Sequence, residues 1–445
     1  MNDSALPESA TPAWWLTPAV LILVPVAASI LSWISLIAWC SAGGCPAGSW
    51  LQLRGFLEPS PITVAGVTLL MVWYALVVVL ATVGWRLGTG TRPSAELVTR
   101  TRLPAFERRY FLLILVVATI GVGYSYYRIA GTTSIIDSLV TQTGNSFTEA
   151  LPASAGIPTL RYATILAAPL GVHLWRTTVI GAPLMIGAVV LLLLNSMVAS
   201  RLSLLMAVVV YLVIWSAARR RADGGTRKPL RPWMVIAGVV VLFALLTTLN
   251  YVRNGNYYRD AGVSNPVAMN VYQMGAYLAV PAQVSLGVSD AVMRGSFEKP
   301  GSVGGSVSAA LPSFLVPEDE TRGKEAVDAG LYDFTVSSAP NFTTNSEFAD
   351  TYADFGAWGW FYTLLLFPLA GYISGRFSTY GPVIAGTTGV IAYCFAEVWR
   401  IQLLTQGIVV FLVLLTVVGM AVAGAGLRTR ADSDDERLYE RSGVT

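Results

Sequence analysis

The sequence predicts an all-α polytopic membrane protein, and three observations support this fold class. Hydrophobic residues make up 54% of the 445-residue chain and charged residues only 12%, with a mean hydropathy of +0.60. A soluble domain carries about a quarter charged residues. The apolar residues gather in stretches close to the roughly 20 residues that a helix needs to cross a bilayer. Basic residues cluster in alternate connections, as the positive-inside rule expects of a multi-pass protein.

We predict about ten transmembrane helices from these stretches, of which the fourth and the ninth are short. The predicted spans are 16–39, 62–85, 110–127, 160–175, 179–198, 202–218, 233–249, 358–375, 383–396 and 403–422. Ala199 to Arg201 leave room only for a tight turn between the fifth and sixth spans.

Four regions follow from this assignment. They are the first seven spans with basic connections (1–249), one large loop (250–356), three further spans (357–424) and a polar tail (425–445). In the large loop carboxylates outnumber basic residues, and Pro266 to Val288 form an amphipathic pattern typical of a helix that lies along the interface or enters the bundle.

Lys and Arg in the short connections predict the orientation. The most basic connections, 86–109 and 219–231, both face the cytoplasm if the N-terminus does. An even number of spans then places both termini in the cytoplasm and the large loop outside. The first apolar stretch lacks a basic leader and a following Ala-x-Ala site, so we expect no cleavable signal peptide.

Several arginines fall at or beyond the outer ends of the predicted spans. They are Arg128, Arg161, Arg201, Arg253, Arg259 and Arg400. A cation near the bilayer core costs roughly 2.5 to 3.5 kcal/mol on insertion scales, so a group of them at one face indicates a bound anion such as a lipid phosphate or diphosphate. The alternative for each is snorkelling to the headgroups or anchoring beside an aromatic belt.

The best candidate for substrate contact is the run from Asn250 to Asp260, directly outside the seventh span. Arg253 and Arg259 offer guanidinium groups that suit phosphate oxygens, and Tyr257 and Tyr258 offer faces and hydroxyls that suit sugar rings.

A second group of polar residues leads into the eighth span, from Asn341 onward. If the chain is helical from position 345, Glu347, Asp350 and Asp354 share one face at i, i+3 and i+7. A carboxylate there is a candidate base that takes the proton of an attacking hydroxyl. The alternatives are a solvated acidic face, or carboxylates that pair with arginines and merely neutralise the charge at this side.

Other chemistries have little support. The only histidine is His173, which argues against a histidine metal site or a Ser-His-Asp triad, and we expect this side chain to be packed or interfacial. Glu397 and Arg400 lie three apart, and we favour an ion pair between them over substrate contact. Cys394 is expected in the core, whereas Cys40 and Cys45 form a disulfide only in an oxidising compartment.

No Walker-type loop occurs, so energy has to come from an activated substrate. No cofactor is indicated. Nucleic-acid binding is not indicated either, because the basic runs flank apolar spans.

The layout resembles bacterial O-antigen polymerases (the Wzy family) and related oligosaccharide repeat-unit polymerases. The similarity rests on Ser200-Arg201 at an outer turn, on the large external loop before the last spans, and on Asn341 through Gly359. The resemblance implies a GT-C-like, metal-independent, inverting glycosyltransferase of the bacterial inner membrane, with an extracytoplasmic active site in the cell envelope.

Such an enzyme transfers a glycan from undecaprenyl diphosphate, or a similar carrier, to a hydroxyl of another lipid-linked repeat unit. Arg201 and Arg253 would match the family's outer-turn and loop arginines. The implied partners are the lipid-linked oligosaccharide, membrane lipids, and a chain-length regulator or flippase. A glycan ligase, a single-sugar transferase and, less favoured, a transporter of lipid-linked glycans remain alternatives.

Overall fold

The computed structural model describes residues 14–42, 62–91, 93–132, 157–199, 201–222, 264–295, 346–425 and 427, and short pieces between 238 and 259. All regular secondary structure in these residues is helical, which confirms the predicted class. Within the described ranges, five helices are long and apolar enough to cross a membrane: Pro18–Ala38, Val64–Gly90, Pro104–Thr132, Leu202–Arg219 and Gly407–Gly424. Two shorter apolar helices are Ala182–Val198 and Pro382–Glu397. The chain is a polytopic membrane protein, and the count of ten spans stays a prediction.

The elements follow the predicted order, with differences at their bounds. In chain order they are η1 (Trp14–Leu16), α1 (Pro18–Ser41), α2 (Val64–Gly90), α3 (Ala95–Arg100), α4 (Pro104–Thr132), η2 (Ile157–Ala163), α7 (Thr164–Arg176), α8 (Ala182–Ala199), α9 (Arg201–Ala222), α11 (Pro266–Met293), α14 (Glu347–Phe355), η4 (Gly356–Trp358), α15 (Gly359–Ser378), α16 (Pro382–Glu397) and α17 (Gly407–Gly424). The predicted fourth span is a 3-10 segment followed by α7. The predicted seventh span is described only in pieces, at 238, 240–241 and 243–248, which are helical.

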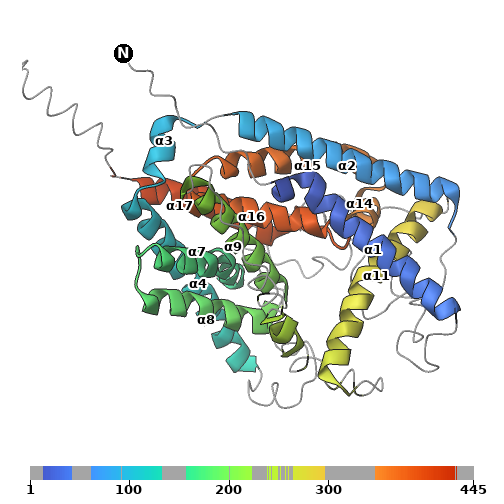
Figure 1. Cartoon of the computed structure of the whole chain (residues 1–445), viewed down its shortest axis with the longest axis horizontal. Coiled ribbons are helices and arrows are strands. Elements are labelled where there is room, and N and C mark those ends of the chain that lie inside the picture. Colours follow the sequence, from blue (N-terminus) through green and yellow to red (C-terminus); the bar gives the residue numbers. More distant parts are fainter. Residues whose placement is uncertain are drawn as a thin grey trace, which may run out of the picture.

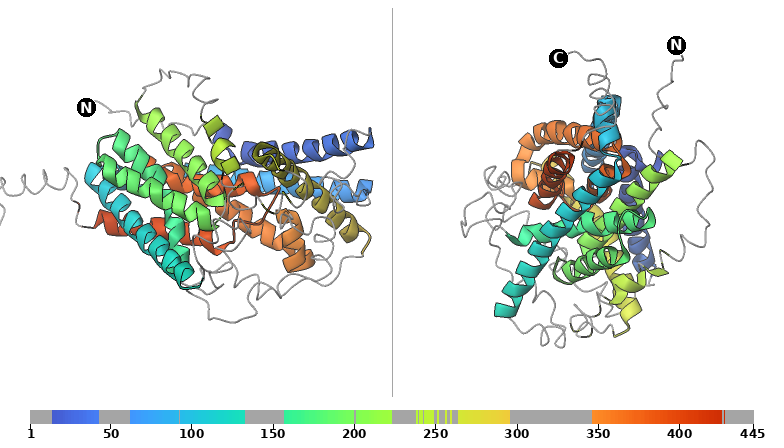
Figure 2. Two further views of the ribbon diagram at one scale, coloured as in Figure 1. Left: turned by 90° about the horizontal axis from the view of Figure 1, so that it is seen from below. Right: turned by 90° about the vertical axis from the view of Figure 1, so that its left-hand side faces the viewer.

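Two groups of helices meet along the central helix α16. Helices α2, α15, α16 and α17 run along the long axis of the molecule, and α4, α7, α8 and α9 form a second group beside them (Figure 1). Helix α16 packs against α9 of the second group and against α1, α15 and α17. Figure 2 shows α1 and α11 at the opposite end from α4. We call the end where α2 begins the α14 end, and the opposite end the α3 end.

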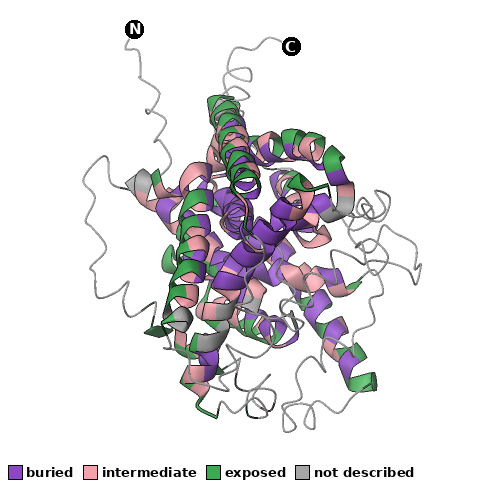
Figure 3. Cartoon of the chain, turned by 90° about the vertical axis from the view of Figure 1, so that its right-hand side faces the viewer, coloured by how far each residue is buried: buried purple, intermediate pink, exposed green. Residues whose placement is uncertain are grey.

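Helix α16 is the centre of the core. Every residue of α16 except Ala396 is buried, and Figure 3 shows the buried residues gathered in the middle of the molecule. The outer helices instead expose apolar side chains, such as Val64 (85% exposed) and Val79 (57% exposed) on α2. Apolar side chains facing outward suit hydrocarbon surroundings, as expected for helices in a bilayer.

Glycines bring α2 and α15 into backbone contact. A Cβ atom at Gly84 would overlap the Pro368 carbonyl oxygen, and one at Gly371 would overlap the Ala81 carbonyl oxygen in the opposite direction. Gly88 and Gly375 repeat this one turn along each helix. This is the small-xxx-small pattern that allows close helix packing in membranes, where a hydrophobic driving force between helices is absent.

Helix α11 enters the bundle, which decides between the two predicted placements. Its start is capped by the Asn265 side chain, which accepts from the backbone N–H groups of Val267 (2.8 Å) and Ala268 (3.2 Å). It packs against α1, α2 and α14, and the Ser29 hydroxyl of α1 donates to its Leu278 carbonyl (2.6 Å). This path crosses the α14 end of the bundle, as Figure 1 shows.

Candidate functional site

The start of α14 is held against the turn that follows α16. The backbone N–H of Ser346 donates to the Arg400 carbonyl (2.9 Å), and the N–H of Glu347 donates to the Val398 carbonyl (3.0 Å). These bonds use backbone donors that a helix start leaves without partners. They place the predicted acidic helix next to the predicted Glu397–Arg400 pair.

Ser346 is fixed in a backbone conformation that side chains rarely adopt. Its φ is 81° and its ψ is 152°, and it is fully buried. Its hydroxyl accepts from the Ala349 N–H (3.2 Å) and lies 2.7 Å from the Ser285 hydroxyl of α11. Such strain costs about 1–3 kcal/mol and persists where the surroundings over-determine it, commonly at functional sites.

Glu347 is the most unusual residue of this region. The predicted helix is confirmed as α14, but Glu347 is 0% exposed, which excludes a solvated face for this residue. Neither carboxyl oxygen has a hydrogen-bond partner among the described residues. Burial raises the pKa of Glu347 well above its ordinary value of 4.5, and the nearby Asp350 raises the pKa further. Burial therefore favours the protonated form of this carboxyl.

Asp350 has a positioning contact. Its Oδ2 accepts from the backbone N–H of Gln402 (3.1 Å), and the Gln402 side-chain amide donates to the Tyr362 hydroxyl (2.8 Å). This network ties α14 and α15 to the segment that leads into α17. Asp354 belongs to α14, but its side chain lies outside the described residues.

Arg400 forms the expected pair with Glu397. Its Nε donates to the Glu397 carboxylate, which confirms the interpretation favoured from the i, i+3 spacing. The guanidinium also lies over the Tyr277 ring of α11, 5.4 Å from its centroid. The charge of Arg400 is thus balanced inside the protein, and its backbone carbonyl accepts from Ser346, the residue before Glu347.

Three further arginines of the predicted site lie within the described residues. Arg128 is exposed near the end of α4. Arg161 donates to the Tyr162 hydroxyl (3.1 Å) and lies 4.8 Å from the centroid of that ring. Arg259 bonds the Asn256 side chain and lies 5.9 Å from the Tyr251 ring centroid. A chamber shared by these arginines and Arg400 stays a prediction.

Several predicted site residues lie outside the described part of the chain. These are Arg253, Tyr257, Tyr258 and Asn341. Arg201 begins α9, directly after α8 ends at Ala199, as the predicted tight turn requires, but its side chain is likewise outside the description.

Asn195, six residues before Arg201 on α8, is a structural residue. It is buried, and its amide donates to the Thr164 hydroxyl (3.0 Å) and the Ser203 hydroxyl (3.2 Å). These bonds join α8 to α7 and α9, so Asn195 holds the helices next to the Arg201 turn.

Histidine and cysteine take the expected structural places. His173 is 9% exposed, and Cys394 is buried in α16. Cys45 and the side chain of Cys40 lie outside the described residues. Within the described ranges, no group of three His, Cys, Asp or Glu side chains is arranged to hold a metal ion.

Sequence reasoning missed Ser285, Ser346 and Gln402. Each acts through a contact between segments far apart in the chain, and their residue types are common in ordinary loops and helices. The amphipathic pattern of α11 identified the helix that carries Ser285, but it did not identify what this residue meets.

Comparison with protein-family models, with curated proteins and with solved structures finds no match. The chemistry of the site therefore has to be argued from its geometry. A buried carboxyl with a raised pKa at a helix start is a candidate for proton transfer, because acid–base groups at functional sites commonly have shifted pKa values.

Proposed function

We propose that this chain is a membrane glycosyltransferase that polymerises polyprenyl-diphosphate-linked oligosaccharide repeat units on the extracytoplasmic face. The observation that carries the proposal is the buried Glu347 carboxyl, held by backbone bonds beside Arg400 at one end of a membrane helix bundle. Perturbed titratable groups of this kind concentrate at functional sites. A substrate built on a lipid also suits a site that membrane helices surround.

The basic residues support this sidedness. Arg100 of α3 and Arg108 and Arg109 of α4 lie at the α3 end, and the positive-inside rule assigns this end to the cytoplasm. The α14 end, with Glu347 and Arg400, then faces the opposite side. This is the side on which lipid-linked repeat units would be joined.

In the proposed reaction, the hydroxyl of an acceptor sugar attacks the anomeric carbon of the donor. The new carbon–oxygen bond forms as the bond to the diphosphate oxygen breaks, and the electron pair leaves with the diphosphate. The ionised form of Glu347 takes the hydroxyl proton. Arg201, Arg253 and neighbouring arginines stabilise the charge that develops on the leaving group. Asp350, which holds Gln402, positions α14.

The test is a gel of surface glycans from a strain in which the gene is deleted. Single attached repeat units in place of a ladder support a polymerase, and reintroducing the chain should restore the ladder. Missing attachment would indicate a ligase instead, and carrier-linked units trapped inside would indicate a flippase. Glu347→Gln should fail to restore the ladder at unchanged membrane abundance. A full ladder with Glu347→Gln would remove Glu347 from the mechanism.

A further inference from the structure

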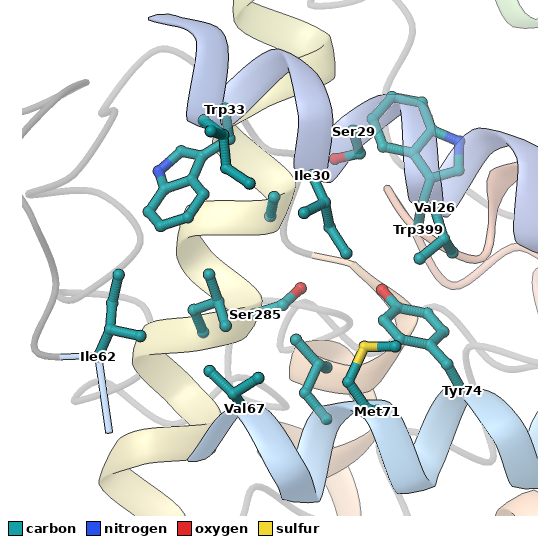
Figure 4. Close-up of a pocket in the computed structure, with 14 residues that line it drawn as sticks. Val26, Ser29, Ile30, Trp33, Ile62, Val67, Met71, Tyr74, Ser285 and Trp399 are labelled. Atoms are coloured by element: carbon teal, nitrogen blue, oxygen red, sulfur yellow. The ribbon is translucent and has the colours of Figure 1, made fainter. Parts of the chain in front are cut away.

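A cavity opens beside the Glu347 site, between α1, α2 and α11. Its volume is about 240 Å³, and Figure 4 shows the side chains of these helices converging on it. This is smaller than the roughly 300–1,000 Å³ of pockets that enclose whole drug-sized ligands. It suits a segment of one chain-like molecule, with the remainder outside.

The lining of this cavity is apolar. Aliphatic and aromatic side chains supply most of it, including Trp33 of α1, Met71 of α2 and Trp399 after α16. Ser29 and Ser285, which also line it, already donate to the Leu278 and Pro281 carbonyls (both 2.6 Å). A cavity holds water only where polar groups provide two to four partners, so hydrocarbon is the suitable occupant.

The rim of the cavity faces the lipid side of the bundle. Ile34 of α1, Ile62 just before α2, and Met71 are 49%, 47% and 49% exposed. They continue the apolar outer surface of α1 and α2. An occupant can therefore enter sideways from the bilayer, where hydrocarbon chains are the surrounding medium.

The inner wall of the cavity adjoins the candidate site. Ser285 lines the cavity and lies 2.7 Å, oxygen to oxygen, from the hydroxyl of Ser346, the residue before Glu347. Trp399 lines it and directly precedes Arg400. A chain seated here would bring its polar end to Glu347 and Arg400.

We propose that this cavity binds the first isoprene units of the polyprenyl chain of the lipid-linked substrate, next to its phosphate end. The identity of the lipid rests on the proposed function. The location of its binding site rests on the geometry of the cavity. It assigns to α1, α2 and α11 the task of presenting the carrier to Glu347 from within the bilayer.

The experiment is photo-crosslinking of the full-length protein in nanodiscs of phosphatidylethanolamine and phosphatidylglycerol. The probe is a polyprenyl monophosphate with a diazirine in its second isoprene unit, and labelled peptides are mapped by mass spectrometry. We expect labels on Trp33, Met71 or Trp399, competed by unlabelled polyprenyl phosphate. Labels only elsewhere, or equal labelling here by a diazirine phospholipid that polyprenyl phosphate does not displace, would overturn the proposal.

A matched pair of substitutions tests the opening. Met71→Trp places a larger side chain at the opening of the cavity without enlarging a core residue. It should lower the affinity of the cavity for the probe, and so the labelling, about tenfold. Val72→Trp lies one position along α2, is 53% exposed and does not line the cavity. It should leave labelling unchanged. Equal effects of the two changes would contradict the assignment of the opening.

The same probe separates this proposal from the proposed function. Glu347→Gln should keep full labelling while losing the glycan ladder. Labelling in the cavity with no effect of gene deletion on glycan length would retain the lipid site and reject the polymerase. Loss of the ladder without labelling in the cavity would reject the lipid site alone.

Discussion

The hydroxyl oxygens of Ser285 and Ser346 lie 2.7 Å apart in the interior, and this contact joins α11 to the start of α14. We expect Ser285→Ala to destabilise the protein by about 0.5–1.5 kcal/mol, the usual net value of one hydrogen bond. It should also shorten the glycan ladder, because the Ser346 turn that carries Glu347 loses a support. Thermal unfolding in detergent and the glycan gel measure the two effects.

Ser289→Ala is the control for this change. Ser289 is buried in the same helix, but its hydroxyl donates only locally, to the Leu286 carbonyl (2.9 Å). The ladder should keep its length in this variant. Equal shortening by both substitutions would show that the loss of either hydroxyl from α11 impairs polymer formation, and that the Ser285–Ser346 contact has no special role.

The buried Glu347 carboxyl should make stability depend on pH. Its folded-state pKa is raised above the ordinary value of 4.5. The contribution of its neutral form to stability is therefore fully present at pH values below 4.5. This contribution is lost as the pH rises toward the folded-state pKa. Glu347→Gln keeps the neutral shape and should flatten this part of the profile, measured as the midpoint of thermal unfolding across a pH series. An unchanged slope in Glu347→Gln would mean that another group titrates.

The Glu397–Arg400 pair allows structure and function to be separated. Arg400→Ala leaves Glu397 partly buried without its partner and should destabilise the protein by about 3–5 kcal/mol. Adding Glu397→Gln removes the unpaired charge and should recover most of the stability. If Arg400 also meets the substrate, the double variant will be present in the membrane and still lack the ladder. A restored ladder would limit Arg400 to a structural role.

The glycine contact between α2 and α15 should tolerate no side chain. Gly84→Ala places a methyl group against the Pro368 carbonyl and should cost about 1–3 kcal/mol or more, seen as a lower unfolding midpoint and less protein in the membrane. Gly123→Ala in α4 is the control, because a Cβ there meets nothing within 4 Å. It should be neutral or slightly stabilising.

The arginines at the outer ends of the predicted spans provide the last prediction. Arg201→Ala and Arg253→Ala should each abolish polymer while leaving the amount of protein in the membrane unchanged. Arg→Lys at the same positions should also impair polymer formation, because an ammonium group cannot bind a diphosphate in the bidentate way. Retained polymer length in the alanine variants would reject their assignment. Blotting of membrane fractions accompanies the glycan gel.

Local patterns predicted local structure well. The i, i+3 spacing of Glu397 and Arg400 predicted their ion pair. The predicted turn at Ala199 to Arg201 is the break between α8 and α9, and α14 forms where the acidic helix was expected. These features depend on residues a few positions apart. Composition likewise established the membrane class, because hydropathy is a property of each stretch by itself.

The helical periodicity of the sequence could not predict that Glu347 is buried. A helical pattern shows which residues share a face, but it does not show what covers that face. Here the start of α14 is joined to α11 through the contact between Ser285 and Ser346, 61 positions apart, and to the Val398 to Arg400 turn through backbone bonds. The strained backbone of Ser346 depends on the same distant contacts.

The absence of side chains between Gly84 and Pro368, and between Gly371 and Ala81, has a mechanical consequence. No side chains lie between these two backbones that could rearrange when the helices move. We therefore expect α2 and α15 to move together as one rigid body. Any widening of the space between α1 and α2 then requires displacement of α1 or α11, or a joint movement of α2 and α15.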